Sequence, residues 1–581
     1  MAKILRVNMK DRTATYQNFP DEYKTRGGRW LTSSLVSDEV DPLCHPLGPN
    51  NKVVLAPGIV TGTAAPTSAR VSVGAKSPLT GAIKESNAGA AWAQDVARLG
   101  LKAIVIESQP EEKDKFWLLH ITKNGVKFLP ADEYLGKGLY EVYPQLFERF
   151  GKKVSIMGIG TAGEHKMAMA GVCFNDLSGR PSRYAGRGGM GAVLGSKGVK
   201  FIMVDDEGGP GVSIDNMNLL NTGRDKLRDA LNTHAISKPK GALNNYGTAV
   251  LINIMNEAGG LPTRNFSSGT FESAAKVAGE AIFKGNKKRL GKGLYNHACS
   301  PGCTIECSNT WYKRDGTEHV SCLEYESVWA LGPNCGISSL DTIAEMVRLC
   351  NNYGFDTIEA GCTIGVAMEA GLTQFGNGRK AIQLLHEIGK GTQLGSILGN
   401  GAAVTGKVFG IVRVPVVKSQ SMPAYDPRAV KGIGITYATT TMGADHTAGY
   451  TIIPEILHIG GKADPLKVRG KGNISRKFQA MTAFLDSAGH CLFIVFPILE
   501  IAAGYEGMVE ECNGVLGTNW RVEDVTRIGL DILRMERKFN EAAGFTSAHD
   551  RLPEFMKYEP LPPHNNVFDV PDRILDKVCK F

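Results

Sequence analysis

Four cysteines have the spacing expected of ligands for an iron-sulfur cluster. Three lie close together in the segment ACSPGCTIECSN, at Cys299, Cys303 and Cys307, and the fourth is Cys491, far downstream in DSAGHC. A cubane cluster needs four thiolates, and a tight triplet with one distant cysteine is a common way to supply them. We therefore predict that these residues bind one 4Fe-4S cluster and that the chain transfers electrons.

Zinc is the alternative occupant of the cysteine triplet. Structural zinc sites usually contain CxxC pairs, whereas these three cysteines recur at every fourth position, so the spacing favours the cluster over zinc. The sequence has twelve cysteines, and most of them are expected to lie in the packed core. Those without a close partner at ligand spacing are Cys44, Cys173, Cys335, Cys350, Cys362, Cys512 and Cys579.

Two segments of similar form each contain an aspartate followed by a glycine. GFDTIEAG contains Asp356 and Gly361, and LDSAGHC contains Asp486 and Gly489. Both segments are expected to begin helices, where an aspartate caps free backbone N–H groups. A carboxylate also matches the paired N–H donors of a pterin ring, as it matches a guanidinium. Each aspartate is thus either a helix cap or a pterin ligand.

The length and composition are those of a large globular protein. A chain of 581 residues is too long for one hydrophobic core and predicts three or four domains. The formal net charge of +8 is small for this length and the basic residues are spread out, which argues against nucleic acid as a partner. The sequence contains no run of about eighteen apolar residues, and its amino terminus lacks the apolar core of a signal peptide. We therefore expect a cytoplasmic protein without a membrane span.

The periodicity of apolar residues predicts an α+β fold that changes in character near residue 206. Short β-branched runs such as KVVLAPGIV, KAIVIES and KFIMVDD come first. Helical periods follow, for example in DNMNLLNTGRDKLRDALNTH and SSLDTIAEMVRLCNNYG. We predict a sheet-rich domain over residues 1–206 and two mainly helical domains over 207–410 and 411–581, with the second boundary near the proline-bearing segment GIVRVPVV.

Several segments in the same order resemble the tungsten-containing aldehyde ferredoxin oxidoreductases, along essentially the whole chain. Besides the two aspartate segments they are SARVSVGAKSPLTGAIKESNAGA, RYAGRGGMGAVLGSK, EYESVWALGPNCG, GADHTAG, and LRMERKFNEAAGF with DRLP. The resemblance implies that the first domain forms a base of two sheets for a tungsten bis-pyranopterin (molybdopterin) cofactor. Two mainly helical domains would cover this base.

The resemblance also implies which residues bind the cofactor. Arg70 would lie between the cluster and the pterin, while Asn87 and Gly89 would contact the pterin phosphates and a Mg2+ ion that bridges them. Arginine forks and glycine N–H groups are suited to neutralising such phosphates. The other implied cofactor-binding positions are Arg183, Arg187, Asp356, Gly361, Asp486 and Gly489.

For catalysis, the resemblance implies a glutamate and a histidine beside tungsten. The matching residues are Glu324 or Glu326 in EYES, and His446 in GADHT. The glutamate would be the general base, and the imidazole would donate a hydrogen bond to the carbonyl oxygen of the aldehyde. Two glutamates at i and i+2 cannot share one helical face, so one of them is expected to reach the metal. His490, beside Cys491, is expected to pack or to support the ligand.

The implied reaction is the oxidation of an aldehyde to a carboxylic acid, reversible in principle, with water as the source of oxygen. Electrons would leave through the 4Fe-4S cluster to a ferredoxin or an iron-sulfur partner subunit, with a flavin subunit as a further partner in a larger complex. An alternative on the same cofactor scaffold is the reduction of aromatic acyl thioesters. The presence of both the EYE segment and His446 argues against this alternative.

Overall fold

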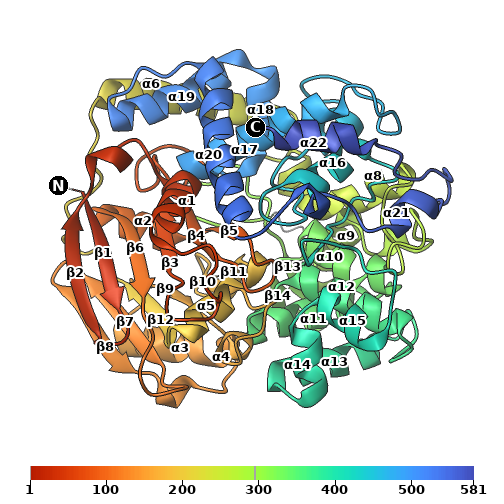
Figure 1. Ribbon diagram of the computed structural model, residues 1–581, viewed down its shortest axis with the longest axis horizontal. Helices are drawn as coiled ribbons and strands as arrows, with labels where there is room; N and C mark the ends of the chain where they lie inside the picture. Colours follow the sequence, from red (N-terminus) through yellow and green to blue (C-terminus); the bar gives the residue numbers. More distant parts are fainter. Residues whose placement is uncertain (1, 293–295) are drawn as a thin grey trace.

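Two six-stranded sheets dominate the first 206 residues of the computed structural model, which describes residues 2–292 and 296–581 (Figure 1). The first sheet has the order β2-β1-β6-β3-β4-β5 and comprises β1 (Lys3–Asn8), β2 (Thr13–Asn18), β3 (Val53–Pro57), β4 (Arg70–Lys76), β5 (Ile83–Gly89) and β6 (Leu101–Glu107). The second has the order β11-β10-β9-β12-β7-β8 and comprises β7 (Trp117–Thr122), β8 (Gly125–Pro130), β9 (Ser155–Gly158), β10 (Val172–Asn175), β11 (Pro181–Ala185) and β12 (Val199–Val204). Both sheets are mixed, because β1 runs parallel to β6 and β7 runs parallel to β12.

Alternating side chains of the first sheet face two different cores. In β3, Val53 and Leu55 belong to the core that the two sheets share, whereas Val54 and Ala56 pack against the helix α1 (Gly28–Glu39). Alternation of this kind follows from the two-residue period of a strand. Because both faces of the sheet are buried, its inner strands consist of nearly continuous apolar residues. The other helices of this region are α2 (Ala91–Arg98), α3 (Leu139–Phe150), α4 (Thr161–Glu164) and α5 (Met190–Ser196).

Helices make up most of the described chain after residue 206, which confirms the predicted α+β class. They are α6 (Met217–Thr233), α7 (Ala242–Tyr246), α8 (Leu251–Glu257), α9 (Gly279–Leu290), α10 (Tyr325–Leu331), α11 (Leu340–Tyr353), α12 (Thr357–Glu369), α13 (Gly378–Lys390), α14 (Gln393–Gly399), α15 (Ala402–Phe409), α16 (Lys431–Thr439), α17 (Lys471–Ala488), α18 (Val495–Glu500), α19 (Ala502–Leu516), α20 (Val522–Ala542), α21 (Phe555–Tyr558) and α22 (Asp572–Cys579). Two small hairpins interrupt them, formed by β13 (Thr310–Tyr312) with β14 (Glu318–Ser321), and by β15 (Val416–Val417) with β16 (Gln420–Ser421). No helix in the described part of the chain combines the length and hydropathy that a membrane crossing requires.

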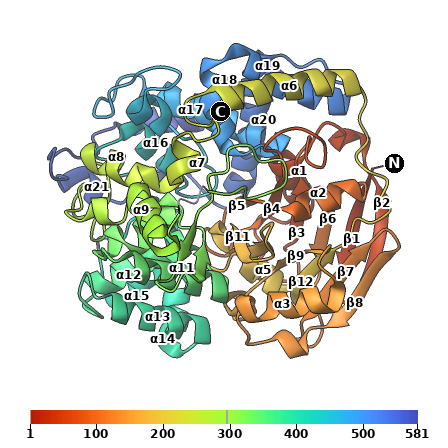
Figure 2. The same ribbon diagram turned by 180° about the vertical axis from the view of Figure 1, so that it is seen from behind.

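Helix α6 packs along α19, far from it in sequence, and Figures 1 and 2 show the two side by side. Glycines allow this close approach. A Cβ on Gly223 would lie 2.5 Å from the carbonyl oxygen of Gly507, and a Cβ on Gly507 would lie 2.6 Å from the carbonyl oxygen of Gly223. The first helix after the sheets is thus packed against the carboxyl-terminal helices.

Candidate functional site

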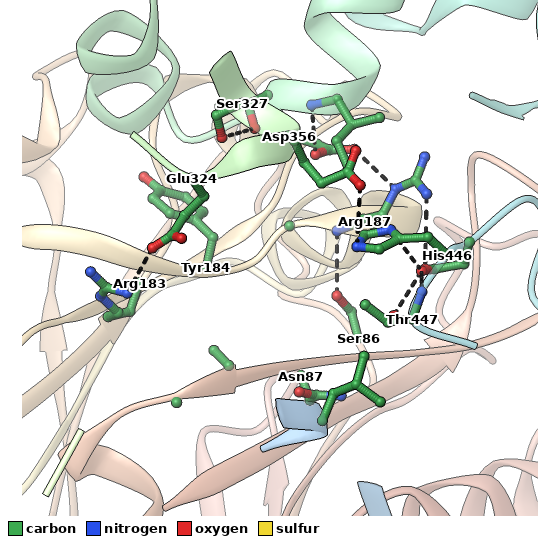
Figure 3. Close-up of a pocket in the computed structure, with 18 of the residues that line it drawn as sticks. Ser86, Asn87, Arg183, Tyr184, Arg187, Glu324, Ser327, Asp356, His446 and Thr447 are labelled. Atoms are coloured by element: carbon green, nitrogen blue, oxygen red, sulfur yellow. Dashed lines mark hydrogen bonds and ion pairs between the residues drawn. The ribbon is translucent and has the colours of Figure 1, made fainter. Parts of the chain in front are cut away.

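A cavity of about 350 Å³ lies where the first sheet meets the helical part of the chain (Figure 3). Figure 3 shows Arg183 and Glu324 on one side of it, Arg187, Asp356 and His446 on another, and Asn87 below them. Of the residues that the sequence indicated, those lining the cavity are Arg70, Asn87, Gly89, Arg183, Arg187, Cys299, Glu324, Glu326, Asp356, His446 and Asp486. Segments from the whole length of the chain therefore meet at one place.

A second cavity, of about 250 Å³, adjoins the first and is lined by all four predicted cluster ligands. Arg70, Arg183 and Cys299 line both cavities. Within residues 2–292 and 296–581, no three His, Cys, Asp or Glu side chains converge on a point that would hold a single metal ion. The four thiols line the same cavity, as the ligands of one multi-atom cluster would.

The cysteine triplet lies on a loop whose base is closed by paired backbone groups. The N–H of His297 donates to the carbonyl of Ser308 at 2.7 Å, and the N–H of Ser308 donates back at 3.1 Å. Thr67 connects this loop to the fourth cysteine. Its N–H donates to the Gly302 carbonyl at 2.8 Å, and its own carbonyl accepts from the N–H of Cys491 at 3.0 Å. Thr67 has φ of 56°, which is strained for a β-branched residue, so this turn is held in place by the segments it joins.

Two arginines surround the thiols with positive charge. Nη2 of Arg70 donates to Sγ of Cys491 at 3.1 Å. A hydrogen bond from Cys303 holds the pKa of Cys299 well below its usual range, and the charges of Arg183 and Arg70 lower it further. Thiolate is the form that binds iron, so the surroundings of Cys299 favour ligation.

Asp486 lies in the last turn of α17, and the prediction that it begins a helix is wrong. The apolar helical period of ISRKFQAMTAFLDSA continues through it, and Gly489, with φ of 95°, supplies the left-handed turn that ends the helix. Oδ1 of Asp486 accepts from Nδ2 of Asn87 at 3.1 Å, and Oδ2 lies 3.4 Å from Nη1 of Arg29. Burial raises the pKa of Asp486 to about 6.

Asp356 does begin a helix and also faces the cavity. Its Oδ1 accepts from the N–H of Ile358 at 3.0 Å and its Oδ2 from the N–H of Glu359 at 3.2 Å, so it caps α12. The same Oδ2 lies 3.4 Å from Nε of Arg187 in the cavity wall. Helix capping and a position at the site are therefore compatible for this residue.

Glu326 and His446 lie against each other in the cavity wall. Nε2 of His446 is 3.4 Å from Oε1 of Glu326, whose Oε2 accepts from the N–H of Ala424 at 3.0 Å. Burial raises the pKa of Glu326 to about 8 and lowers the pKa of His446 to about 4. Oε1 of Glu326 and Nδ1 of His446 have no hydrogen-bond partner within the described residues. The pair can therefore hold or move a proton beside a bound molecule.

Glu324 lies just before α10 and has different partners. Its Oε2 accepts from Oγ1 of Thr248 at 2.7 Å, its Oε1 accepts from Oγ of Ser308 at 3.4 Å, and Oε1 is also 4.0 Å from Nη1 of Arg183. Both carboxylate oxygens thus have hydrogen-bond donors, whereas Glu326 keeps one oxygen free. This difference favours Glu326 over Glu324 as the residue that handles protons.

Two of the predicted cofactor-binding glycines are absent from the lining of both cavities. A Cβ on Gly361 would lie 2.5 Å from the backbone of Ala330, so this glycine allows α12 to pack closely on α10. A Cβ on Gly489 would lie 2.4 Å from Oγ1 of Thr61, against the first sheet domain. Their positions indicate a role in chain packing next to the site, and no contact with its interior.

Several residues of the site carry no sequence signal. Arg29 is buried and donates to both carboxylate oxygens of Glu536, at 2.9 and 2.8 Å. Cys322, with φ of 87°, accepts a hydrogen bond from Arg183. Neither pair is visible as a motif, because its members come from distant elements. Lys84, Glu85 and Asp445 also line the cavity; they lie in segments that carry the family resemblance but were assigned no role there.

Comparisons with known proteins relate the chain to one family. A family model described as the N-terminal domain of aldehyde ferredoxin oxidoreductase matches residues 4–206, and a model of domains 2 and 3 matches residues 224–580. The tungsten-containing aldehyde ferredoxin oxidoreductase of Pyrococcus abyssi is 37% identical over 96% of this chain and 92% of its own length. The protein of the same description from Pyrococcus furiosus is 35% identical, with the same coverage.

One solved structure shares the fold at lower identity. It is the active-site complex BamBC of benzoyl coenzyme A reductase with 1,5-dienoyl-CoA, and the two chains have a TM-score of 0.78. The alignment covers 99% of this chain and 93% of the other, with 17% identity. At this identity the likeness concerns the fold.

Proposed function

The chain belongs to the aldehyde ferredoxin oxidoreductase family and is an oxidoreductase, and on this basis we propose that it oxidises aldehydes to carboxylic acids with a tungsten bis-pyranopterin cofactor and one 4Fe-4S cluster. The observation that carries the proposal is the pair of Glu326 and His446, 3.4 Å apart, which lines both the first cavity and the cavity that four cysteines line.

The residues of the first cavity fit an anionic pterin cofactor. Arg187 and Arg183 are buried there and offer guanidinium groups to phosphate, with Nε of Arg183 lacking a partner in the described structure. Asp356 and Asp486 offer carboxylates to the N–H donors of two pterins. Asn87 is the residue beside which we propose that Mg2+ would bind and add to this neutralisation of the pterin phosphates.

The chain's own contribution to the chemistry is proton handling. When bound, the tungsten cofactor supplies a two-electron couple and the cluster a one-electron relay. Glu326 in its carboxylate form accepts a proton from the attacking water. The imidazole of His446, neutral because its pKa is lowered to about 4, donates from its protonated nitrogen to the aldehyde oxygen.

The overall balance of the proposed reaction needs an electron acceptor. An aldehyde and one water give a carboxylate, three protons and two electrons, and a cluster held by the four cysteines would pass these electrons on singly. Arg70 lines both cavities and donates to Sγ of Cys491, which supports a position between the cluster and the pterin. We propose a ferredoxin or an iron-sulfur partner subunit as the acceptor, and a flavin subunit as a further partner where a larger complex forms.

Metal analysis with a dye-linked assay tests this function. Anaerobically purified protein is expected to contain about one tungsten and four irons per chain, with little zinc, and to reduce benzyl viologen when given aldehydes. Molybdenum is measured in the same experiment. Iron without tungsten or molybdenum, together with no aldehyde-dependent reduction of the dye, would overturn the proposal. Zinc in place of iron would overturn the assignment of the cysteines.

Reduction of aromatic acyl thioesters is the second candidate function on the same scaffold. The fold that the chain shares with the benzoyl coenzyme A reductase complex is the reason to assay this second function. The pair formed by Glu326 and His446 favours aldehyde oxidation, because water activation needs a base beside the reacting carbon. An assay of benzoyl-CoA with reduced viologen separates the two functions, since only the second would consume the thioester.

A further inference from the structure

One buried carboxyl group in the first cavity has no part in the proposed chemistry. Glu85, on β5, is 4% exposed, and its side chain lines the cavity of about 350 Å³. Its Oε1 has no hydrogen-bond partner within residues 2–292 and 296–581. We propose that Glu85 is a further cofactor-binding residue, whose carboxyl group accepts a hydrogen bond from an N–H group of the pterin on the Asp486 side of the cavity. This inference rests on the proposed function.

The strand β5 directs Glu85 and Asn87 to the same side of the first sheet. Alternate residues of a strand share a face, and two residues span about 7 Å. Ile83 on this face packs in the core around α1, whereas Ala88 on the other face packs in the core between the two sheets. Asn87, at the lower edge of the cavity in Figure 3, donates from Nδ2 to Oδ1 of Asp486 at 3.1 Å. Glu85 is therefore one step along the strand from the residue that bonds Asp486.

The neighbouring strand β4 offers Glu85 no side-chain donor directly opposite. The residue across the ladder is Gly74, where a Cβ would lie 2.6 Å from Cβ of Thr32 on α1. The backbone N–H of Glu85 donates to Sδ of Met442 at 3.4 Å, which leaves the carboxyl group free. Ser72 lies nearby on β4, but its Oγ has no hydrogen-bond partner among the described residues either. The surrounding side chains thus leave an acceptor open towards the cavity.

The two cations next to Glu85 are bonded to other carboxylates. Arg29 donates to both oxygens of Glu536, at 2.9 and 2.8 Å. Nζ of Lys84 lies 3.3 Å from Oδ2 of Asp445. In the part of the chain that the structure describes, no lysine, arginine or histidine nitrogen lies within 4.0 Å of a Glu85 oxygen. The carboxyl group therefore has no ion pair that would explain its burial.

Asp486 already has partners, which makes Glu85 the free acceptor on this side of the cavity. Oδ1 of Asp486 accepts from Asn87, and its Oδ2 lies 3.4 Å from Nη1 of Arg29. Burial, followed by the charge of Asp486, raises the pKa of Glu85 to about 8. The two carboxylates disfavour each other's charge, and a ligand with N–H donors offsets this effect. A buried acceptor without a donor is also costly, so a ligand that supplies one gains from binding here.

The chemistry that fits Glu85 is a ring edge with N–H donors. A carboxylate repels phosphate, for which the cavity wall already offers the guanidinium groups of Arg183 and Arg187. The amino and amide N–H groups of a pterin are donors that a carboxyl oxygen accepts. Magnesium would compete for the same oxygen, because it prefers carboxylate ligands. The magnesium content of a Glu85 variant distinguishes these two ligands.

Pterin release tests the role of Glu85. Glu85→Met removes both acceptor oxygens at nearly constant volume, whereas Glu85→Gln keeps one. Ser72→Ala is the matched control, because it removes the nearby hydroxyl group and leaves the carboxyl group in place. The rate of pterin release from the holoenzyme is measured in mild urea, together with tungsten and magnesium per chain. We expect release about tenfold faster in Glu85→Met, a smaller increase in Glu85→Gln, and the wild-type rate in Ser72→Ala.

Three results would overturn the role of Glu85. The first is a wild-type release rate in Glu85→Met. The second is equally fast release in Ser72→Ala, since Glu85 would then serve the packing of the sheet. The third is a loss of magnesium with pterin retained, which would make Glu85 a metal ligand. If Glu85→Met does not accumulate as folded holoenzyme, Glu85→Gln decides, and a wild-type release rate in that variant would overturn the role.

The same measurements separate this inference from the proposed function. A wild type that holds tungsten and pterin but oxidises no aldehyde would overturn the proposed function, while faster release in Glu85→Met would still support the contact with pterin. Normal aldehyde oxidation by the wild type, with unchanged release in Glu85→Met, would overturn the contact alone. A wild type without pterin would overturn both.

Discussion

Arg70 and Cys491 are joined by a hydrogen bond from Nη2 to Sγ at 3.1 Å. The bond connects β4 of the first sheet to the segment after α17. Burial disfavours the Arg70 cation, yet the Cys491 and Cys299 thiols outweigh burial and raise the pKa of the guanidinium. This arginine therefore stays charged beside the proposed cluster.

We expect Arg70→Gln to lower the reduction potential of the cluster. Reduction adds negative charge, which a charged hydrogen bond to a ligand sulfur stabilises. Such bonds contribute about 1.5–3 kcal/mol, and about 1.4 kcal/mol corresponds to about 59 mV for one electron, so a fall of about 60–130 mV is expected. EPR-monitored potentiometry measures the potential, and Arg70→Lys, which keeps the charge, should fall less. An unchanged potential in Arg70→Gln would contradict this role.

Thr67 is expected to determine whether the cluster is retained. Thr67→Gly suits the observed φ of 56° and keeps both backbone hydrogen bonds, so its iron content should equal that of the wild type. Thr67→Pro removes the N–H that reaches Gly302 and fixes φ near −65°. Iron per chain is measured on the fraction that keeps wild-type near-UV circular dichroism. In the proline variant it should fall below about half of the wild-type value. Equal iron in both variants would show that this turn does not hold the ligands.

Glu326→Gln is expected to lower kcat by about 10²–10⁴-fold, the range typical of a lost general base. In the wild type, the pKa of Glu326 is about 8 and only its carboxylate form can act as the base. The wild-type rate should therefore rise as the pH increases through 8 and then level off. The glutamine variant should lose this rise. Glu324→Gln is the matched control, because Glu324 already accepts from Thr248 and Ser308. If Glu324→Gln removes the rise instead, the assignment of the two residues is reversed.

Gly361→Ala distinguishes packing from cofactor binding. The new Cβ would lie 2.5 Å from the backbone of Ala330, so the two helices must separate. Overpacking of this kind costs about 1–3 kcal/mol, and we expect a lower Tm. Tungsten per folded chain should stay as in the wild type. A loss of tungsten without a loss of thermal stability would instead support the original prediction that Gly361 binds cofactor.

The sequence predicted those parts of the site that depend on local spacing. The cysteine triplet lies on one loop, and Asp356 caps a helix, because both features arise within a few neighbouring residues. Asp486 was placed at the wrong end of its helix, since a glycine after an aspartate occurs at either end. Short β-branched runs predicted a sheet-rich first domain, and its two sheets were implied by the family resemblance.

Pairings between distant residues could not be predicted. Arg29 meets Glu536 because α1 lies against α20, and nothing in either segment specifies that contact. No motif indicates a role for Cys322, since its bond to Arg183 depends on how β11 approaches the chain after β14. A buried charge requires a partner, but a single sequence does not say which one.

The placement of Gly28 and Gly58 against the end of α17 has a consequence for the order of events in the cell. A Cβ on Gly28 would lie 2.2 Å from the carbonyl oxygen of Asp486, and a Cβ on Gly58 would lie 2.1 Å from Cα of Gly489. The segment that carries Asp486 and Cys491 therefore follows Gly28 and Gly58, which it contacts, by more than four hundred positions in the sequence. A nascent chain still on the ribosome lacks that wall, so both cavities stay incomplete until synthesis has passed Cys491.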